Sequence, residues 1–229
     1  PASHSEIAHL KTPNDLIRWG MSRFVEANLY YGHGTDNALD EARWLVQHAL
    51  HLPQGLPAHY MVTHLCPDEV AAALDLLKAR IHSRKPAAYL TGIAYFAGLP
   101  FIVNEDVLIP RSPIGELIQR GFQPWLGERA PLRILDLCTG SGCIAIACAA
   151  AFPDAEVVAV DLSPNALDIA QQNVVKHGLE DRVSCVLSDL FMALKGQTFD
   201  LIVTNPPYVS TEEYEALPNE YRHEPRMAL

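Results

Sequence analysis

Apolar residues recur at helix-like spacing through residues 1–85, and this pattern predicts a small helical domain. Loops rich in turn-forming residues separate the helical stretches. Three helices are expected: one capped by Ser5 or Thr12, one capped by Asp36 or Asn37, and one running from Pro67 to Ile81.

A different pattern begins after Lys85-Pro86, which we interpret as a hinge. Residues 93–96 and 100–103 flank Ala97-Gly98-Leu99 and predict a short hairpin. We therefore expect residues 86–108 to form a hinge and hairpin segment between the helical domain and the remainder of the chain.

Short apolar runs alternate with helical stretches through residues 109–229. The runs that predict buried strands are 133–137, 156–160, 183–187 and 199–203, and the expected helices begin near Ser112-Pro113, at Ile144 and after Ser163. Alternation of this kind predicts an α/β domain built on a doubly wound, Rossmann-like parallel sheet.

A glycine-rich turn, Cys138–Gly142, joins the first of these strands to its helix. Glycine lets backbone N–H groups come close to a ligand, and a helix N-terminus adds a positive dipole end. Asp161, 25 residues after Asp136, follows the second strand, where a carboxylate can accept hydrogen bonds from ribose hydroxyls. The segment predicts a nucleotide site, and residues 140–145 also match the Gly-x-Gly-x-x-Ala fingerprint of NAD-dependent dehydrogenases.

An Asn-Pro-Pro-Tyr motif, Asn205, Pro206, Pro207 and Tyr208, follows the fourth strand at the sheet edge where open α/β folds bind ligands. The Asn205 side chain and the Pro206 carbonyl can accept both N–H bonds of a planar amide or aromatic amine, which favours localisation of the nitrogen lone pair. The prolines stiffen the loop, and Tyr208 can stack on the planar group. Hydride transfer needs none of these features. The motif therefore favours methyl transfer to such a nitrogen, with a rigid turn after a strand as the alternative.

Together with the glycine-rich turn, this motif resembles the class I S-adenosylmethionine-dependent methyltransferases and, more narrowly, the protein-glutamine methyltransferases. The upstream segments Tyr89–Gly92, Phe96–Phe101 and Val107–Arg111 are similar to the same family. Within this family, the chain is most similar to the branch that methylates a glutamine of the third large-subunit ribosomal protein. The similarity lies in Ser112–Glu116, in Cys138, where most relatives have glycine, and in Pro218–Pro225.

The resemblance implies S-adenosylmethionine as cofactor and a glutamine side chain of a ribosomal protein as substrate. It also implies that the helical domain recognises the substrate; the alternative is that this domain serves only as a scaffold. The residues that it places at the cofactor are Leu108, Arg111, Asp136, Cys138, Thr139, Gly140, Gly142, Asp161, Asp189, Leu190 and Asn205. Asp136 would set the turn, Thr139 and the two glycines would meet the methionine part, and Asp161 the ribose. Asp189 and Leu190 would meet the adenine, although Asp189 could instead cap a helix.

Charge and cysteine content bear on the partners of this chain of 229 residues. With 17 basic and 27 acidic residues the net charge is −10, and no basic stripe is present to meet phosphates. This balance suits a basic protein substrate. It disfavours the nearest alternative, an adenine-amine methyltransferase that acts on nucleic acid; a non-catalytic module for ribosome assembly is another alternative.

Cysteine usage favours a reduced cytoplasm, because the five cysteines form no Cys-x-x-Cys pair and no secretory apolar segment occurs in the first thirty residues. No apolar run is long enough to span a bilayer. His48 and His51 lie one turn apart but lack a carboxylate or cysteine to complete a site, so no metal is expected.

The strand count predicts an incomplete catalytic domain. Four parallel strands are expected, whereas the class I sheet that the chain resembles has seven, including a closing antiparallel hairpin. The chain stops at Leu229, where a further helix is expected, so we predict that the sheet lacks its C-terminal part.

Overall fold

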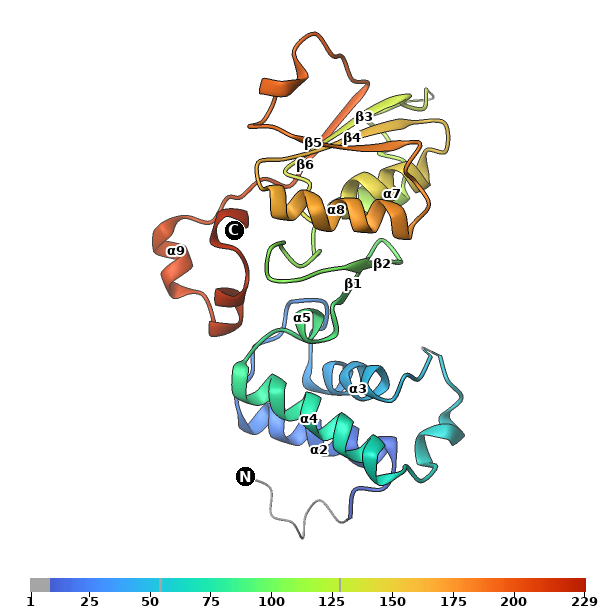
Figure 1. Ribbon diagram of the computed structural model, residues 1–229, viewed down its shortest axis with the longest axis vertical. Coiled ribbons are helices and arrows are strands. Elements are labelled where there is room, and N and C mark those ends of the chain that lie inside the picture. The colour runs from blue at the N-terminus through green and yellow to red at the C-terminus, as the bar shows by residue number, and fades with distance from the viewer. Residues whose placement is uncertain (1–8, 54, 128) are drawn as a thin grey trace. The chain divides into compact units, whose positions relative to one another are not determined.

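The computed structural model describes residues 9–53, 55–127 and 129–229, and the chain divides into two compact units, Pro1–Thr91 and Gly92–Leu229 (Figure 1). The division falls within the segment 86–108 that the sequence marks as hinge and hairpin. It lies a few residues beyond residue 85 because Ala87 and Leu90 pack into the core of the first unit.

The first unit consists of helices around an apolar core. They are α2 (Pro13–Glu26), α3 (Ala38–Ala49), the 3-10 helix η1 (Ala58–Val62), α4 (Pro67–Ser83) and α5 (Ala87–Thr91). Thr12 and Asn37 cap α2 and α3 by accepting hydrogen bonds from the N–H groups of Asp15 and Asp40, at 3.2 and 2.9 Å. Ser5, the other candidate for the first cap, lies outside the described residues.

A buried ion pair joins α3 to α4. Arg80 Nε donates to Glu41 Oε1 at 2.7 Å, and both side chains are 1% exposed. Arg80 also donates to the Tyr30 carbonyl at 2.9 Å, while the Thr35 hydroxyl donates to the second Glu41 oxygen at 3.1 Å. Burial raises the pKa of Glu41 and the Arg80 charge opposes that rise, so each member of the pair compensates the other.

The second unit begins with a hairpin of β1 (Ile93–Phe96) and β2 (Leu99–Ile102). Ala97 and Gly98 form its turn with φ of 49° and 82°, the left-handed geometry of two-residue turns between antiparallel strands. Leu99 pairs with Phe96 and opens β2, so the expectation that it belongs to the turn was wrong by one residue. The helix α6 (Ile114–Gln119) then begins one residue after Pro113.

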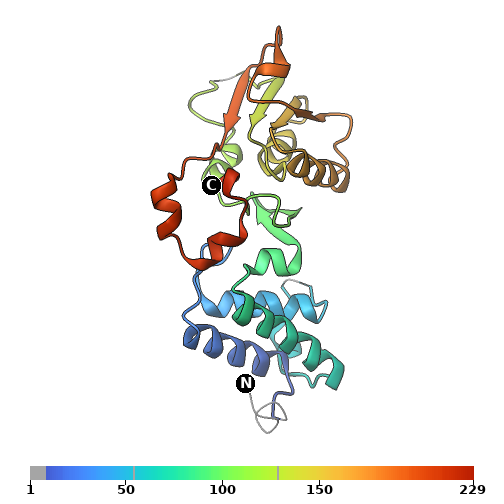
Figure 2. The same cartoon turned by 60° about the vertical axis from the view of Figure 1, so that its left-hand side comes forward.

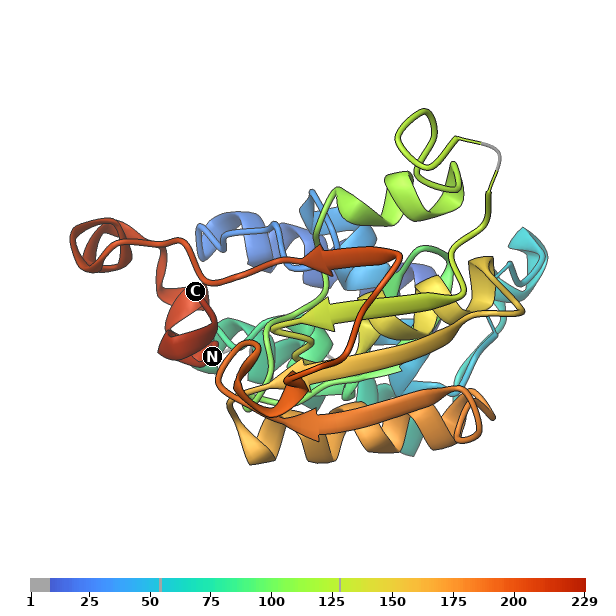
Figure 3. The same ribbon diagram turned by 90° about the horizontal axis from the view of Figure 1, so that it is seen from above.

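Four parallel strands form the main sheet in the order β5-β4-β3-β6 (Figure 3). They are β3 (Arg133–Leu137), β4 (Glu156–Asp161), β5 (Val183–Leu187) and β6 (Leu201–Thr204). The chain moves outward from β3 through β4 to β5 and then returns to the other side of β3 as β6. Open α/β sheets bind ligands at such a reversal of strand order, which here lies between β3 and β6.

The strand β6 begins two residues later than the apolar run 199–203 predicted, because the Asp200 side chain instead binds backbone N–H groups at the start of β3. Its carboxylate accepts hydrogen bonds from the N–H groups of Leu132 and Arg133, each at 2.9 Å. Phe199 packs beside the apolar cluster on the sheet. The end of the β5–β6 connection thus fixes the beginning of the central strand.

Helices α7 (Cys143–Ala151) and α8 (Pro164–Lys176) lie on one face of the sheet (Figure 1). Ile146 of α7 is fully buried in one cluster with Ile134 and Val203 of the sheet. On the opposite face, Leu135 and its neighbours pack with Leu194 of η2 (Met192–Leu194). No helix of the described residues combines the length and apolar character needed to cross a bilayer.

After β6 the chain makes an excursion and returns to the strand ends (Figure 2). It contains α9 (Thr211–Ala216) and the 3-10 helices η3 (Asn219–His223) and η4 (Arg226–Ala228). The N–H groups of Tyr208 and Val209 both donate to the Leu229 carbonyl, at 2.8 and 2.7 Å, so the two ends of the excursion are joined.

Replacement of Arg80 by Met should destabilise the first unit by about 3–5 kcal/mol, because Glu41 would remain buried without its partner. The control Arg43→Met removes an exposed side chain that lies 3.6 Å from Asp40, and it should lower the free energy of unfolding by less than about 1 kcal/mol. Urea unfolding of both variants measures the difference, and similar costs for the two would contradict the assignment of Arg80 to the core.

Candidate active site

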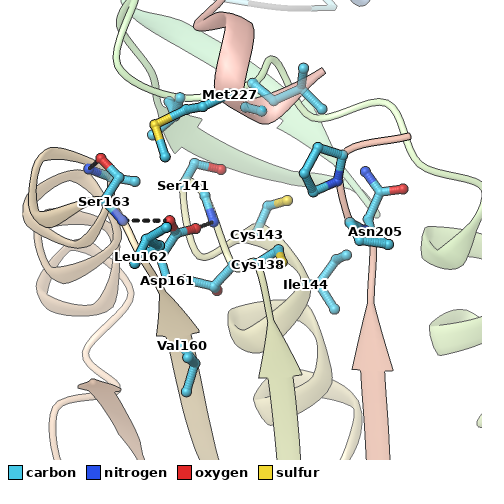
Figure 4. A pocket seen from close by; sticks show the side chains of 18 of the residues that line it. Cys138, Ser141, Cys143, Ile144, Val160, Asp161, Leu162, Ser163, Asn205 and Met227 are labelled. Atoms are coloured by element: carbon cyan, nitrogen blue, oxygen red, sulfur yellow. Dashed lines mark hydrogen bonds between the residues drawn. The ribbon is translucent and has the colours of Figure 1, made fainter. Parts of the chain in front are cut away.

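A cavity of about 400 Å³ lies at the C-terminal ends of the parallel strands (Figure 4). Each strand end contributes to its wall: Cys138 after β3, Asp161 at the end of β4, Asp189 after β5 and Asn205 after β6. The predicted residues that line it are Leu108, Arg111, Cys138, Thr139, Gly140, Asp161, Asp189, Leu190, Asn205, Pro206 and Pro207. Three predicted residues, Asp136, Gly142 and Tyr208, do not line it.

Asp136 lies fully buried beneath the glycine-rich turn. One of its oxygens, Oδ2, accepts hydrogen bonds from the Thr139 hydroxyl at 2.6 Å and from the Ala145 N–H at 3.0 Å. Burial raises the pKa of Asp136 to about 7, because desolvation outweighs these two donors and the Asp161 carboxylate opposes a second negative charge. Asp136 therefore ties the end of β3 to the start of α7 and fixes the turn between them.

The two glycines of the turn are required for different reasons. Gly140 has φ of 54°, and a Cβ built there would meet nothing within 4 Å, so its face is open to the cavity. Gly142 has φ of 79°, and a Cβ there would lie 3.2 Å from the Cβ and 3.3 Å from the Cα of Ala170. Gly140 thus exposes backbone to a ligand, whereas Gly142 permits α8 to approach the turn.

Asp161 binds the turn as well as lining the cavity (Figure 4). Its Oδ2 accepts a hydrogen bond from the Gly140 N–H at 2.9 Å, and its Oδ1 accepts one from the Ser163 N–H at 2.9 Å. Each carboxylate oxygen has a second acceptor position. The side chain can therefore hold the turn and still meet the hydroxyls of a ligand.

Cys138 occupies a backbone conformation that favours glycine, with φ of 59°. A left-handed conformation costs a residue with a side chain about 1–2 kcal/mol. Burial raises the pKa of the Cys138 thiol, and the Asp161 carboxylate adds a smaller rise in the same direction. The thiol therefore stays protonated and weakly nucleophilic. The backbone explains why glycine suits this position, and the cysteine makes the turn more strained.

Ser188 shapes the wall that follows β5. Its hydroxyl donates to the Leu190 carbonyl and accepts the Ala193 N–H, both at 2.9 Å, and Leu190 has φ of 48°. The Asp189 side chain lines the cavity and makes no hydrogen bond to any residue of the described ranges. The alternative in which Asp189 caps a helix is therefore not observed, since η2 has no side-chain cap.

The Asn205 loop leaves the sheet directly beside the β3 turn. The Thr204 hydroxyl donates to the Leu137 carbonyl at 2.9 Å, which holds the ends of β6 and β3 together. Asn205 is half-buried, and its side-chain amide is not hydrogen-bonded within the described part of the chain. Tyr208 is 79% exposed and does not line the cavity, and its contact with the acceptor group stays a prediction.

Sequence reasoning missed the residues that arrive from the excursion. Met227 and Ala228 line the cavity, and Met227 lies across from Asp161 in Figure 4. Glu224, which is 3% exposed, accepts hydrogen bonds from the Ile109 N–H at 3.0 Å and from Arg111. The sequence marks Pro218–Pro225 only as a family motif, and no periodicity in it indicates these contacts.

The cavity suits a ligand that carries adenosine and an amino acid. Its volume lies in the range of small-molecule sites. The Asp161 and Asp189 carboxylates can accept hydrogen bonds from hydroxyls and an exocyclic amine, and the open face of Gly140 admits backbone contact. No cluster of three or more potential metal ligands occurs among the described residues.

Comparisons with known proteins identify relatives of both units. The Methyltransferase small domain matches residues 124–219, and the PrmC N-terminal domain matches residues 15–92. The ribosomal protein uL3 glutamine methyltransferase of Xanthomonas campestris pv. campestris is 53% identical over 221 residues, covering 96% of this chain and 71% of the relative. Its namesake in Bordetella pertussis is 49% identical over 223 residues, covering 96% and 74%.

Among solved structures, the 16S rRNA N2 G1207 methyltransferase of T. thermophilus, in complex with AdoMet and guanosine, is 26% identical. The match covers 51% of this chain and 32% of that one, with a TM-score of 0.41.

Asp136 should make stability depend on pH. Its native pKa of about 7 lies above the ordinary value of 3.8, so the native state holds this proton more tightly than the unfolded chain. Its contribution is full below about pH 4 and is lost as the pH rises through about 7, a change on the order of 4 kcal/mol. Urea unfolding between pH 4 and 8 should show this slope.

The variant Asp136→Asn should lose that component of the slope, whereas the exposed control Asp154→Asn should keep it. Identical pH profiles for the natural chain and Asp136→Asn would contradict a buried, proton-binding Asp136.

Replacement of Cys138 by Gly should leave stability unchanged or raise it by up to about 1 kcal/mol, because relief of the left-handed strain offsets the entropy cost of glycine. Ser184→Gly, at an exposed position of β5, should instead cost about 0.5–1 kcal/mol. Thermal melts compare the two, and equal losses would show that Cys138 is not strained.

Proposed function

This chain belongs to the family of ribosomal protein uL3 glutamine methyltransferases, and we propose that it methylates the side-chain amide nitrogen of a glutamine in that ribosomal protein. The observation that carries the proposal is the position of Asn205 and Pro206 on the cavity wall at the reversal between β3 and β6. Both residues line the same cavity as the glycine-rich turn.

The cofactor is S-adenosylmethionine, which when bound supplies a methyl group on a sulfonium centre. In our proposal Asp161 accepts hydrogen bonds from the ribose, and Asp189 with Leu190 meets the adenine. Thr139 and Gly140 present the turn to the methionine part. Asp136 and Gly142 act indirectly, since the first fixes the turn from below and the second lets α8 support it.

The acceptor is held by oxygens that suit an amide. An amide nitrogen is a poor nucleophile because its lone pair is delocalised into the carbonyl group. The Asn205 side-chain oxygen and the Pro206 carbonyl accept its two N–H bonds, which orients the nitrogen toward the methyl group and favours localisation of the lone pair. Alignment of this kind supplies roughly 7–11 kcal/mol of a barrier. The nitrogen releases its proton to water after the new bond forms.

The Pro1–Thr91 unit has a separate role in this proposal, the recognition of the protein substrate. Its match to the PrmC N-terminal domain supports this role. We propose that the chain acts in the cytoplasm, where its substrate is made, and that it does not bind nucleic acid directly.

The direct test incubates the chain with S-adenosylmethionine and unmethylated uL3, with a release factor in a parallel reaction, and reads intact masses. We expect a gain of one methyl group on uL3 alone. A gain on the release factor alone would keep the chemistry and reject the substrate. No gain on either protein, with transfer to nucleic acid instead, would favour the adenine-amine alternative.

Replacement of Asn205 by Ala should lower the transfer rate by at least about 100-fold, because one acceptor of the amide N–H bonds is lost from a preorganised site. The Kd for S-adenosylmethionine should change less than about threefold. Calorimetry and intact mass give the two values, with Asn14→Ala on the exposed side of α2 as control. Equal losses of binding and transfer would contradict the role of Asn205 in holding the acceptor.

A further inference from the structure

One wall of the cavity is held by the chain segment that returns after α9. We call residues 219–228 the return arm, and its contacts are with residues 104–111. His223 Nδ1 lies 3.2 Å from a Glu105 carboxylate oxygen, and the Glu224 carboxylate accepts the Ile109 N–H at 3.0 Å. The arm supplies Met227 and Ala228 to the cavity, so these contacts determine where that side of the site lies.

The strongest of these contacts is a two-pronged ion pair. Arg111 donates through Nη1 and Nη2 to the two oxygens of Glu224, at 2.5 and 2.8 Å. The Glu224 side chain is 0% exposed and that of Arg111 is 24% exposed. The Arg111 guanidinium also lies over the Tyr221 ring, 5.3 Å from its centre. Paired carboxylate and guanidinium groups that are largely withdrawn from water interact strongly.

The charges on the cavity wall are unequal. Among the described residues that line the cavity, Arg111 is the only cationic side chain, and three carboxylates accompany it, those of Asp106, Asp161 and Asp189. Glu224 does not line the cavity but cancels the one positive charge that does. The wall is therefore left with an excess of negative charge.

We propose that Glu224 is a positioning residue that acts through Arg111 and sets the preference of the cavity for the cationic cofactor over its neutral product. The inference rests on the proposed function. S-adenosylmethionine has a net charge of one, from a sulfonium, an ammonium and a carboxylate, whereas S-adenosylhomocysteine lacks the sulfonium charge and is neutral overall. By neutralising Arg111, Glu224 lets the three carboxylates favour binding of the cofactor and release of the product.

Replacement of Glu224 by Gln removes the carboxylate that pairs with the Arg111 guanidinium and so makes the net charge of the site more positive by one. At an effective dielectric constant of about 20 and a separation on the order of 10 Å, a unit charge changes the binding of a cationic ligand by about tenfold. The same charge changes the binding of the neutral product much less. We therefore expect the ratio of the Kd for S-adenosylmethionine to the Kd for S-adenosylhomocysteine to rise about tenfold in Glu224→Gln.

The experiment measures both dissociation constants by calorimetry for the natural chain and its variants, each checked for folding by circular dichroism. The double variant Glu224→Gln/Arg111→Gln removes both charges of the pair, which keeps the net charge of the site, and should restore the ratio to within about threefold of the natural value. Glu105→Gln is the matched control, because it removes a carboxylate that contacts the same arm but whose partner His223 does not line the cavity. It should leave the ratio unchanged.

The possible outcomes separate charge from structure. Glu224→Gln could instead weaken the binding of both ligands equally, or the double variant could keep the altered ratio of dissociation constants. Either result would overturn the inference and leave Glu224 a purely structural contact. Should Glu224→Gln not fold, Arg111→Gln tests the same point, since loss of the Arg111 charge makes the site more negative by one and should lower the ratio. A natural chain that binds neither ligand would overturn the proposed function itself.

Discussion

The buried carboxylate of Asp136 is the interaction on which the cavity depends. It accepts hydrogen bonds from Thr139 and Ala145, and so closes a tight turn between the central strand and its helix. A turn that short requires left-handed backbone at Cys138, Gly140 and Gly142. The open backbone that can meet a ligand is thus a consequence of how the strand is joined to the helix.

Strand order then brings the second half of the site to this turn. Because β6 returns to the far side of β3, residues nearly seventy positions apart become neighbours, and Thr204 bonds the Leu137 carbonyl. Asn205 follows immediately and carries its side-chain amide to the cavity wall. One sheet edge therefore carries both the glycine-rich turn and Asn205, which in our proposal hold the cofactor and the glutamine amide.

Much of this arrangement could be predicted from the sequence, because the signals are local. The strands follow from short apolar runs, and the glycine-rich turn and the Asn-Pro-Pro motif are contiguous. The class I fold was confirmed, and eleven of the fourteen expected site residues line the cavity. The places of the other residues depend on tertiary context: a Cβ at Gly142 would crowd Ala170, and Tyr208 is exposed, with its N–H bonded to the Leu229 carbonyl. The pair of Arg111 and Glu224 spans 113 residues, and no local pattern encodes it.

The most direct test of the account is a crystal structure of the chain with S-adenosylhomocysteine bound. We predict that the ligand lies in the cavity at the strand ends, with its ribose at Asp161, its adenine at Asp189 and its amino-acid part at Gly140. The Asn205 side chain should border the sulfur atom. A ligand bound elsewhere, or bound here with its ribose away from Asp161, would contradict the account.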